Sequence, residues 1–217
     1  MAKKKKRPDP PSTPVRHKAP RPAAPTGRTD PRQAVSRAAA KRRLIAGGLA
    51  AAALVAVAAY VIDSRRGDAE LRTALTAGSC EVDSKADGKT TATGHVPDPT
   101  YTVEPPAGGN HNPGAARGGV YAGTSVPDDG LLVHSLEHGY VVAWHRPDLP
   151  AAQQAQLESF EQRHQGDVIV VERAGLPVSI AATSWGQRLL CDSVEPDVLD
   201  RFAERYIGKG PENVPRG

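Results

Sequence analysis

Aromatic residues make up only 4% of this 217-residue chain, and methionine and cysteine are almost absent. A hydrophobic content of 39% with so few aromatics allows one modest core and excludes a large multidomain enzyme. Met1 is the only methionine, which excludes a methionine-type Cu(I) site. The two cysteines form no Cys-x-x-Cys motif, so dithiol catalysis of the thioredoxin kind lacks its main component.

Common enzyme motifs are also missing. The chain contains no Gly-x-Ser-x-Gly, no phosphate-binding loop of the Walker type and no dinucleotide-binding fingerprint. These absences favour a protein that is not an enzyme, without deciding the question.

Charge is divided unevenly along the chain. Residues 1–43 carry 14 Lys and Arg against two acids, whereas the remainder carries 14 Lys and Arg against 22 acids. The first segment contains eight prolines and no aromatic residue, so it cannot bury enough surface to offset the entropy of ordering. We expect a disordered basic tail that lies against anionic lipid headgroups, and we expect no nucleic-acid partner.

A run of 19 uncharged residues, Leu44 to Ile62, follows this tail. As a helix it would span roughly 28 Å, close to the ~30 Å hydrocarbon thickness of a bilayer. We interpret it as a transmembrane helix. A signal peptide cleaved near Ala58-Ala59 is an alternative, although a 43-residue leader is long for one. A buried globular helix is another, but an alanine-rich run with Gly47-Gly48 offers little to pack.

The positive-inside bias predicts the orientation of this helix. Lys41, Arg42 and Arg43 precede the run, and only Arg65 and Arg66 follow it closely. We therefore expect a cell-membrane protein that crosses the lipid bilayer once, with a cytoplasmic N-terminus and an extracytoplasmic C-terminal domain. The expected divisions are a tail at 1–43, a membrane helix at 44–62, a juxtamembrane stalk at 63–93, the domain at 94–212 and a C-terminal tail at 213–217.

Hydrophobic periodicity and glycine or proline stops predict an α+β domain. It would hold a small mixed sheet, two packed helices and a long Pro/Gly-rich ordered loop region, behind the transmembrane helix. The pattern is similar to half of a thioredoxin-like or ferredoxin-like unit. The expected strands are 140–145, 167–172, 177–183 and 185–191, with a short one within 94–126; the expected helices are 128–138, 149–164 and 194–207.

Cys80 and Cys191 both lie on the predicted outer side of the membrane. An oxidising compartment favours a disulfide between them, which would close a loop of roughly 110 residues. Two unpaired thiols are the alternative.

Histidine is concentrated in the predicted outer domain, and His134-Ser-Leu-Glu137-His138 is its strongest local feature. On a helix the two histidines and the glutamate share one side, as a divalent metal site requires. On a strand the histidines would lie roughly 13 Å apart and Glu137 would face the other way. His95 and His111 are candidate further ligands, and imidazole suits zinc or copper. We expect His145 and His164 to be surface residues.

Three functions remain open for this cluster. The first is a metal site without hydrolytic activity. The second is a scaffold or interaction domain of the cell envelope, in which the histidines only brace loops through hydrogen bonds and an envelope protein is the partner. The third is a zinc hydrolase, since His-x-x-Glu-His matches the inverzincin pattern with Glu137 as general base.

Several spaced motifs together resemble the bacterial DUF3105 family, a domain of unknown function usually carried behind an N-terminal membrane anchor. The resemblance covers roughly residues 94 to 212, and it departs from the family pattern at Ala107, Gly108 and Asn110. It supports the domain boundaries and singles out the same histidines and glutamate, but it implies no activity. The motifs are Gly94-His95-Val96, Pro105-Pro106, Gly109-Asn110-His111-Asn112-Pro113, Gly119-Val120-Tyr121, Leu132 to Gly139, Trp185-Gly186 and Gly210-Pro211-Glu212.

Overall fold

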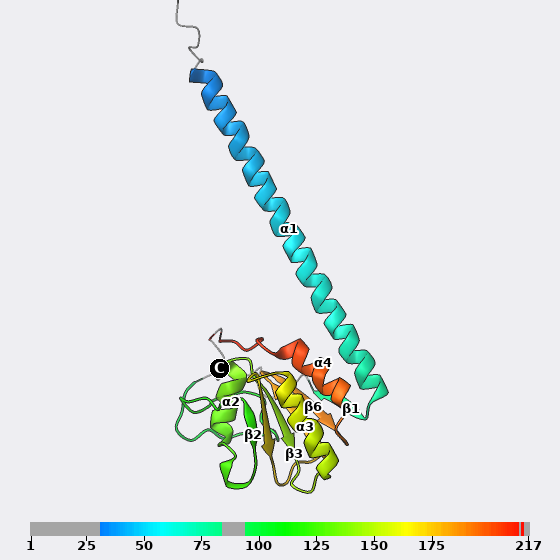
Figure 1. The fold of residues 1–217 in the computed structure, drawn as a ribbon. Coiled ribbons are helices and arrows are strands. Elements are labelled where there is room, and N and C mark those ends of the chain that lie inside the picture. The colour runs from blue at the N-terminus through cyan, green and yellow to red at the C-terminus, as the bar shows by residue number, and fades with distance from the viewer. Residues whose placement is uncertain (1–30, 84–93, 213, 215–217) are drawn as a thin grey trace, which may run out of the picture. The chain divides into compact units, whose positions relative to one another are not determined.

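The computed structural model of the chain describes residues 31–83, 94–212 and 214. The chain divides into two compact units, Met1–Leu54 and Val55–Gly217. Within the described part of the first unit, the chain is helical throughout. The second unit carries an α+β fold, as the sequence predicts (Figure 1).

Helix α1, Pro31–Ala77, is longer at both ends than the expected membrane helix. Within the residues described, its stretch Gly48–Ala77 is long and apolar enough to cross a membrane. Residues 31–43 were expected to be disordered and are helical instead, which suits their alanine and arginine content. The rest of the expected disordered tail, residues 1–30, lies outside the described residues. Between Leu49 and Ile62 the apolar side chains of α1 are exposed, among them Leu54, Val57 and Tyr60.

The last turns of α1 belong to the domain and are not a free stalk. Leu71 is only 5% exposed and packs in the same core as Phe202. Arg205 donates a hydrogen bond of 2.6 Å to Asp68. The expectation of a free stalk at 63–93 is therefore wrong for residues 63–83, the part of it that the structure describes. One buried apolar side chain is enough to dock a helix that is otherwise polar.

A mixed sheet forms the centre of the domain. The described residues build six strands in the order β1-β6-β5-β3-β4-β2. The pair β3–β4 is parallel and so is β4–β2, whereas β3–β5, β5–β6 and β6–β1 are antiparallel. The strands are β1, Cys80–Asp83; β2, Gly119–Tyr121; β3, Val141–His145; β4, Val168–Glu172; β5, Ile180–Ser184; and β6, Gln187–Cys191.

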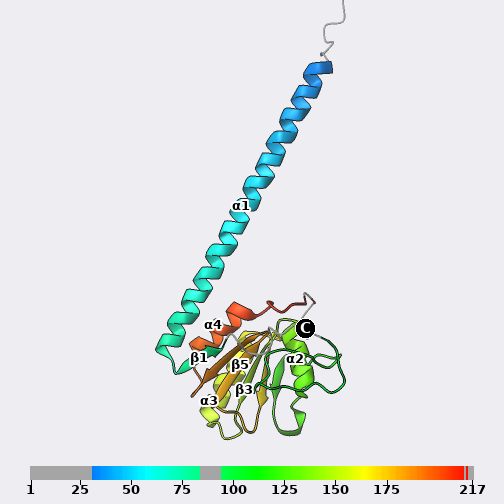
Figure 2. The ribbon, with the colours of Figure 1, turned by 180° about the vertical axis from the view of Figure 1, so that it is seen from behind.

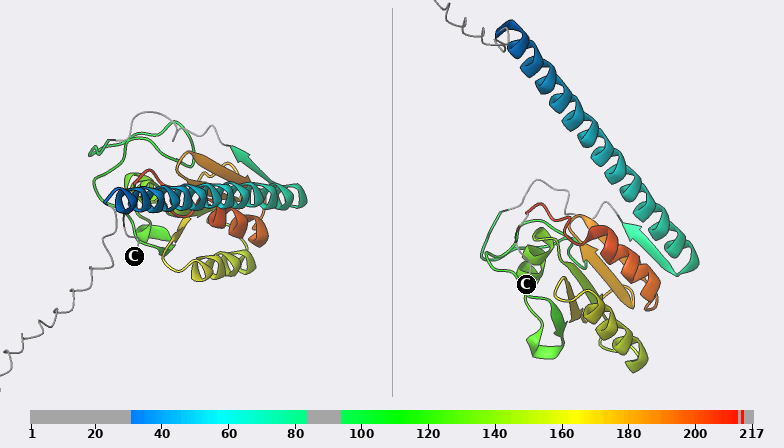
Figure 3. Two further views of the ribbon diagram at one scale, coloured as in Figure 1. Left: turned by 90° about the horizontal axis from the view of Figure 1, so that it is seen from above. Right: turned by 45° about the horizontal axis from the view of Figure 1, so that its top comes forward.

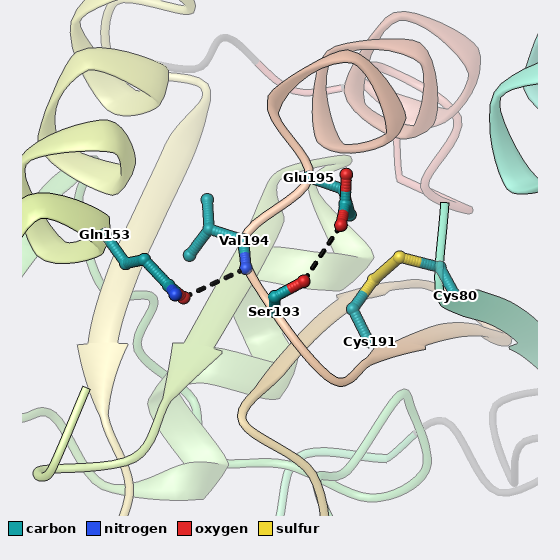
Figure 4. The surroundings of a disulfide bond; sticks show 6 residues. All are labelled: Cys80, Gln153, Cys191, Ser193, Val194 and Glu195. Atoms are coloured by element: carbon teal, nitrogen blue, oxygen red, sulfur yellow. Dashed lines mark hydrogen bonds between the residues drawn. A yellow bond between two sulfur atoms is a disulfide. The ribbon is translucent and has the colours of Figure 1, made fainter. Parts of the chain in front are cut away.

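Strand β1 was not expected, because its Cys-Glu-Val-Asp sequence lies in a polar run. It pairs with β6 so that Cys80 stands opposite Cys191, and the two are joined by a disulfide (Figure 4). Just beyond β6, the Ser193 hydroxyl donates to Glu195 at 2.8 Å. The disulfide is as predicted. Strand β1, which carries Cys80, was not predicted, because its order comes from pairing with β6 and not from its own sequence.

Helices cover both faces of this sheet. Residues of β3 alternate between two cores, with Val141 and Ala143 in one and Val142 and Trp144 in the other. The first core also takes α3, Ala151–Arg163, and α4, Pro196–Tyr206; the second takes α2, Asp129–Glu137. Figure 1 shows α3 and α4 in front of the sheet, and the strands come forward in the reverse view of Figure 2. A short 3-10 turn, Gly123–Ser125, joins β2 to α2.

The N-terminal end of α2 is held by Arg173, which follows β4. Its guanidinium pairs with both oxygens of Asp129 at 2.7 and 2.8 Å, and with Glu104 at 2.6 and 3.0 Å. The same group lies 5.5 Å from the centre of the Trp144 ring. These bonds raise the pKa of Arg173 above its usual value, through Glu104 first and Asp129 second. Helix α2 is thereby fixed against the sheet at the end opposite Glu137.

Candidate metal centre

Helix α2 positions the central pair of the candidate site. The helix begins after Asp128, and the expected stop follows at Gly139, whose φ of +88° favours glycine. His134 and Glu137 are three residues apart on the last turn, so their side chains share one side of the helix. Both are buried, at 6% and 5% exposure. Of the two conformations considered for the His134–His138 segment, helix and strand, the structure therefore contains the helix.

The Pro/Gly-rich loop region supplies two more imidazoles. His95 and His111 face each other across an isolated parallel bridge. The backbone N–H of Val96 donates to the His111 carbonyl at 2.8 Å, and the His111 N–H donates to the Gly94 carbonyl at 3.1 Å. This bridge sets the two imidazole ring centres 5.0 Å apart. The Trp185 ring lies nearly perpendicular to the His111 ring, with 6.0 Å between ring centres.

Four side chains converge. Nε2 of His111 lies 2.8 Å from Oε2 of Glu137, and Nε2 of His95 lies 4.0 Å from the same oxygen. One ligand atom from each of these residues and one from His134 all lie within 4.8 Å of one another. Zinc–nitrogen and zinc–oxygen bonds of about 2.0–2.2 Å place two ligand atoms at most about 4.4 Å apart, so only small shifts would let this group close on a single ion. We call His95, His111, His134 and Glu137 the inner group.

Backbone carbonyls orient two of the imidazoles. Nδ1 of His111 lies 2.9 Å from the Gly109 oxygen, and Nδ1 of His134 lies 2.7 Å from the Asn112 oxygen. A carbonyl oxygen only accepts, so each Nδ1 donates its proton. In the neutral ring Nε2 then carries a lone pair. Metal-binding histidines are oriented in this way, with the other ring N–H held by a carbonyl or carboxylate.

The Nε2 atom of His111 is the most informative atom of the inner group. Its side chain is fully buried, and Nε2 has no hydrogen-bond partner among the described residues. It faces the Glu137 carboxylate, which also presents lone pairs. Two buried lone pairs 2.8 Å apart repel unless a proton or a metal cation lies between them. The chemistry of this pair therefore calls for a positive charge.

His138, the remaining predicted ligand, belongs to an adjoining group. It caps the C-terminal end of α2, and its Nε2 lies 2.9 Å from Nε2 of His134 and 3.4 Å from Oε2 of Glu212. Burial, followed by the charge of His134, lowers the pKa of His138 below its usual value. One ligand atom each from His134, His138 and Glu212 lie within 4.8 Å of one another. We call these three residues the outer group.

Glu212 is a residue that sequence reasoning did not place in the site. The segment after α4 runs across to the end of α2 (Figure 3), where the Gly208 N–H donates to Gly139 and the Glu212 N–H donates to Glu137. A Cβ atom on Gly210 would overlap the Glu137 carbonyl oxygen, so only glycine allows this approach. The Gly210-Pro211-Glu212 motif was the signal available in the sequence.

Two other histidines lie apart from both groups. His145 was expected on the surface but is only 6% exposed at the end of β3, and its Nδ1 donates to the Arg146 carbonyl at 2.9 Å. It is buried because every residue of β3 is covered by a core. His164 pairs with Asp200 at 3.0 Å, and its side chain is 15% exposed. It is therefore also more enclosed than a free surface residue.

The arrangement differs from the one a hydrolase of the His-x-x-Glu-His kind requires. That pattern needs His134 and His138 on one ion, with Glu137 free to act as base. Here Glu137 points to His111 and His95, inside the inner group. Glu137 is thus grouped with the loop histidines and does not stand apart from them as a free general base would.

Together the fold and the site define a class of protein. It is a mixed α+β domain with a His/Glu group at the end of one helix, preceded by a helix long and apolar enough to cross a membrane. The chain belongs to the DUF3105 family, whose model, described as "Protein of unknown function (DUF3105)", matches residues 95–216. The resemblance seen in the sequence is thereby confirmed. No curated protein and no solved structure matches the chain.

Proposed function

We propose that the domain binds one divalent metal ion through the inner group. The observation that carries this proposal is the buried Nε2 of His111, which faces the Glu137 carboxylate at 2.8 Å without a hydrogen-bond partner. A cation between them replaces a repulsion with two coordinate bonds. His134 and His95 complete a set of three imidazoles and one carboxylate.

Zinc is the ion that this donor set favours. Tetrahedral zinc is commonly held by imidazole nitrogens and a carboxylate oxygen. Soft sulfur donors, which select Cu(I), are absent from the inner group, and both cysteines are in the disulfide. Copper(II) is the competing ion, since imidazole also suits it.

The test measures metal on the full-length chain in detergent micelles. After chelator stripping and reloading, bound zinc and copper are counted by mass spectrometry, and affinity is measured against a chromophoric chelator. We expect about one zinc per chain, and Glu137→Gln should weaken the affinity by about 100-fold. Glu158→Gln is the matched control, because Glu158 is an exposed glutamate on α3, on the other face of the sheet.

Equal zinc affinity in the wild type and in Glu137→Gln would contradict the proposal. A His111→Gln variant provides a second reading, with disulfide formation and thermal unfolding as checks that it folds. If neither variant changes binding, the histidines only brace loops. A cell-envelope scaffold, whose partner would still be captured by both variants, would then be the better description.

We also infer that the chain is a single-pass membrane protein with its domain outside the cytoplasm. Two observations support this: the basic residues that precede the apolar run, and the disulfide, which persists in oxidising compartments. The basic tail would then contact anionic lipid on the cytoplasmic side. Protease treatment of intact cells should digest the domain and spare the tail; the reverse result would overturn the orientation.

A further inference from the structure

The inner and outer groups share one ligand atom. His134 belongs to both groups, and its Nδ1 donates to the Asn112 carbonyl, so Nε2 is the atom it can offer to either one. This Nε2 is 2.9 Å from Nε2 of His138. A neutral imidazole whose Nδ1 carries the proton has one lone pair, on Nε2. That lone pair can bind one ion at a time. The two groups are therefore alternative positions for one ion and not a two-metal centre.

We propose that the outer group is a loading station, from which a zinc ion passes to the inner group while it stays bound to His134. This inference rests on the metal-binding function proposed above. In the transfer the bonds to His138 and Glu212 break as bonds to His111 and Glu137 form. One carboxylate is exchanged for another, so the net charge of the ligands around the ion is unchanged. A proton that bridges His111 and Glu137 before the ion arrives is released to solvent.

The outer group is more exposed to solvent than the inner group, so an ion from solution would reach the outer group first. The Glu212 side chain is 45% exposed and that of His138 is 19% exposed, whereas the values for Glu137 and His111 are 6% and 0%. An exposed carboxylate attracts cations from solution. The inner group then offers four ligands where the outer group offers three, so the ion is held more tightly inside.

A second opening exists at His95, whose side chain is 48% exposed. Its ring is stacked on the His134 ring, with 4.8 Å between centres and 14° between planes. Of the two carboxylates in the inner and outer groups, only that of Glu212 is exposed. The outer group therefore has the electrostatic advantage in capturing a cation.

The outer group is held in place by the backbone. The Glu212 N–H donates at 3.1 Å to the carbonyl of Glu137, the residue that carries the inner carboxylate. The Gly208 N–H donates at 2.8 Å to the carbonyl of Gly139, one residue beyond His138. Close packing of Gly210 against the Glu137 backbone fixes the same segment. The backbones of Glu212 and Glu137, which carry the carboxylates of the two groups, are thus held next to each other by hydrogen bonds.

The experiment follows zinc exchange by stopped flow with a chromophoric chelator on the full-length chain in detergent. We expect Glu212→Gln to lower the association and dissociation rate constants of zinc together, by about tenfold each, with the dissociation constant changed less than about twofold. His138→Ala should act in the same direction. Glu158→Gln, which removes the same charge from α3, should change neither rate.

Each alternative result has a definite meaning. Unchanged rates in Glu212→Gln would overturn the loading station. A loss of affinity as large as that in Glu137→Gln would make Glu212 a ligand of the resting ion and would also overturn it. Two zinc ions bound at once would contradict the shared ligand. A wild-type chain that binds no zinc would remove the proposed function itself, a result separable from the others because wild-type affinity is measured first.

Discussion

Nε2 of His111 and Oε2 of Glu137 lie 2.8 Å apart in the interior of the domain, with the other nitrogen of that ring already bonded to a carbonyl. A loop and a helix that are distant in sequence bring these two acceptor atoms together. Their proximity is unfavourable unless a proton or a metal cation lies between them, so in the metal-free domain the pair is repulsive wherever no proton bridges it.

This repulsion gives a prediction for Glu137→Gln. The amide N–H of the variant can donate to His111, so the metal-free variant should be more stable than the metal-free wild type by about 1 kcal/mol. Added zinc should raise the unfolding temperature of the wild type more than that of the variant, because the form that binds zinc more tightly is stabilised more. Thermal unfolding of chelator-stripped protein, with and without zinc, measures both effects. A zinc-dependent rise of equal size in the variant would contradict the assignment of Glu137.

Removal of the disulfide should destabilise the domain strongly. The bond joins residues 111 apart in sequence, and it links β1 to the sheet (Figure 4). The chain-entropy model gives about 4–5 kcal/mol for a loop of this size. Urea unfolding of a Cys80→Ala/Cys191→Ala double variant measures the loss. Thiol titration in denaturant should find reactive thiols only after reduction; thiols that react without a reductant would refute the pairing.

Arg173 should contribute more to stability than an exposed arginine does. It is forked between Asp129 and Glu104, with 24% of its side chain exposed. Lysine keeps the charge but cannot form the paired bonds, so Arg173→Lys should cost about 1–2 kcal/mol. Arg146→Lys is the control, because Arg146 pairs with Asp148 at an exposed site and should lose less than about 0.5 kcal/mol. Equal losses in urea unfolding would show that Arg173 does not anchor α2.

Tyr101 should make the domain sensitive to alkaline pH. Its hydroxyl donates to the Asn110 carbonyl at 2.9 Å, and burial, followed by the charge of Asp129, raises its pKa. The folded state therefore favours the neutral phenol. The stability this provides is complete below the unfolded pKa of about 10 and is lost as the pH rises from there toward the folded pKa.

The comparison with Tyr101→Phe isolates this effect. The variant loses the hydrogen bond, so it should be less stable than the wild type near pH 8 by about 1 kcal/mol. Above pH 10 the free energy of unfolding of the variant should fall less steeply with pH than that of the wild type. The difference in stability between the two proteins should therefore become smaller. Urea unfolding at a series of pH values measures the slopes, and parallel slopes would exclude Tyr101 as the group responsible.

Much of the fold follows from local signals in the sequence. The strand expected at 140–145 is β3, Val141–His145, and the helix expected at 149–164 is α3, Ala151–Arg163. Both are bounded by glycine or proline, and the apolar pattern between such stops is a local property. Strand β1 had no such pattern, because its order comes from pairing with β6.

The candidate site shows the same division. Spacing alone identified His134, Glu137 and His138 as neighbours on one helix, since three or four residues make one turn. Which of them would lie beside His95 and His111 depended on a loop that no periodicity describes. The structure keeps His134 and His138 together, with Glu212 beside them, as the spacing suggested. It places Glu137 with His134 and the two loop histidines, which the spacing could not show.

The sequence by itself determined the apolar helix, the α+β order of the domain, its family and the pool of histidines, because each of these is encoded in composition or in short-range spacing. Only the tertiary structure decided which nitrogen faces which carboxylate. Those contacts join segments far apart in the chain, and the backbone hydrogen bonds that aim them, from Gly109, Asn112 and the C-terminal segment, exist only after the sheet and helices have packed.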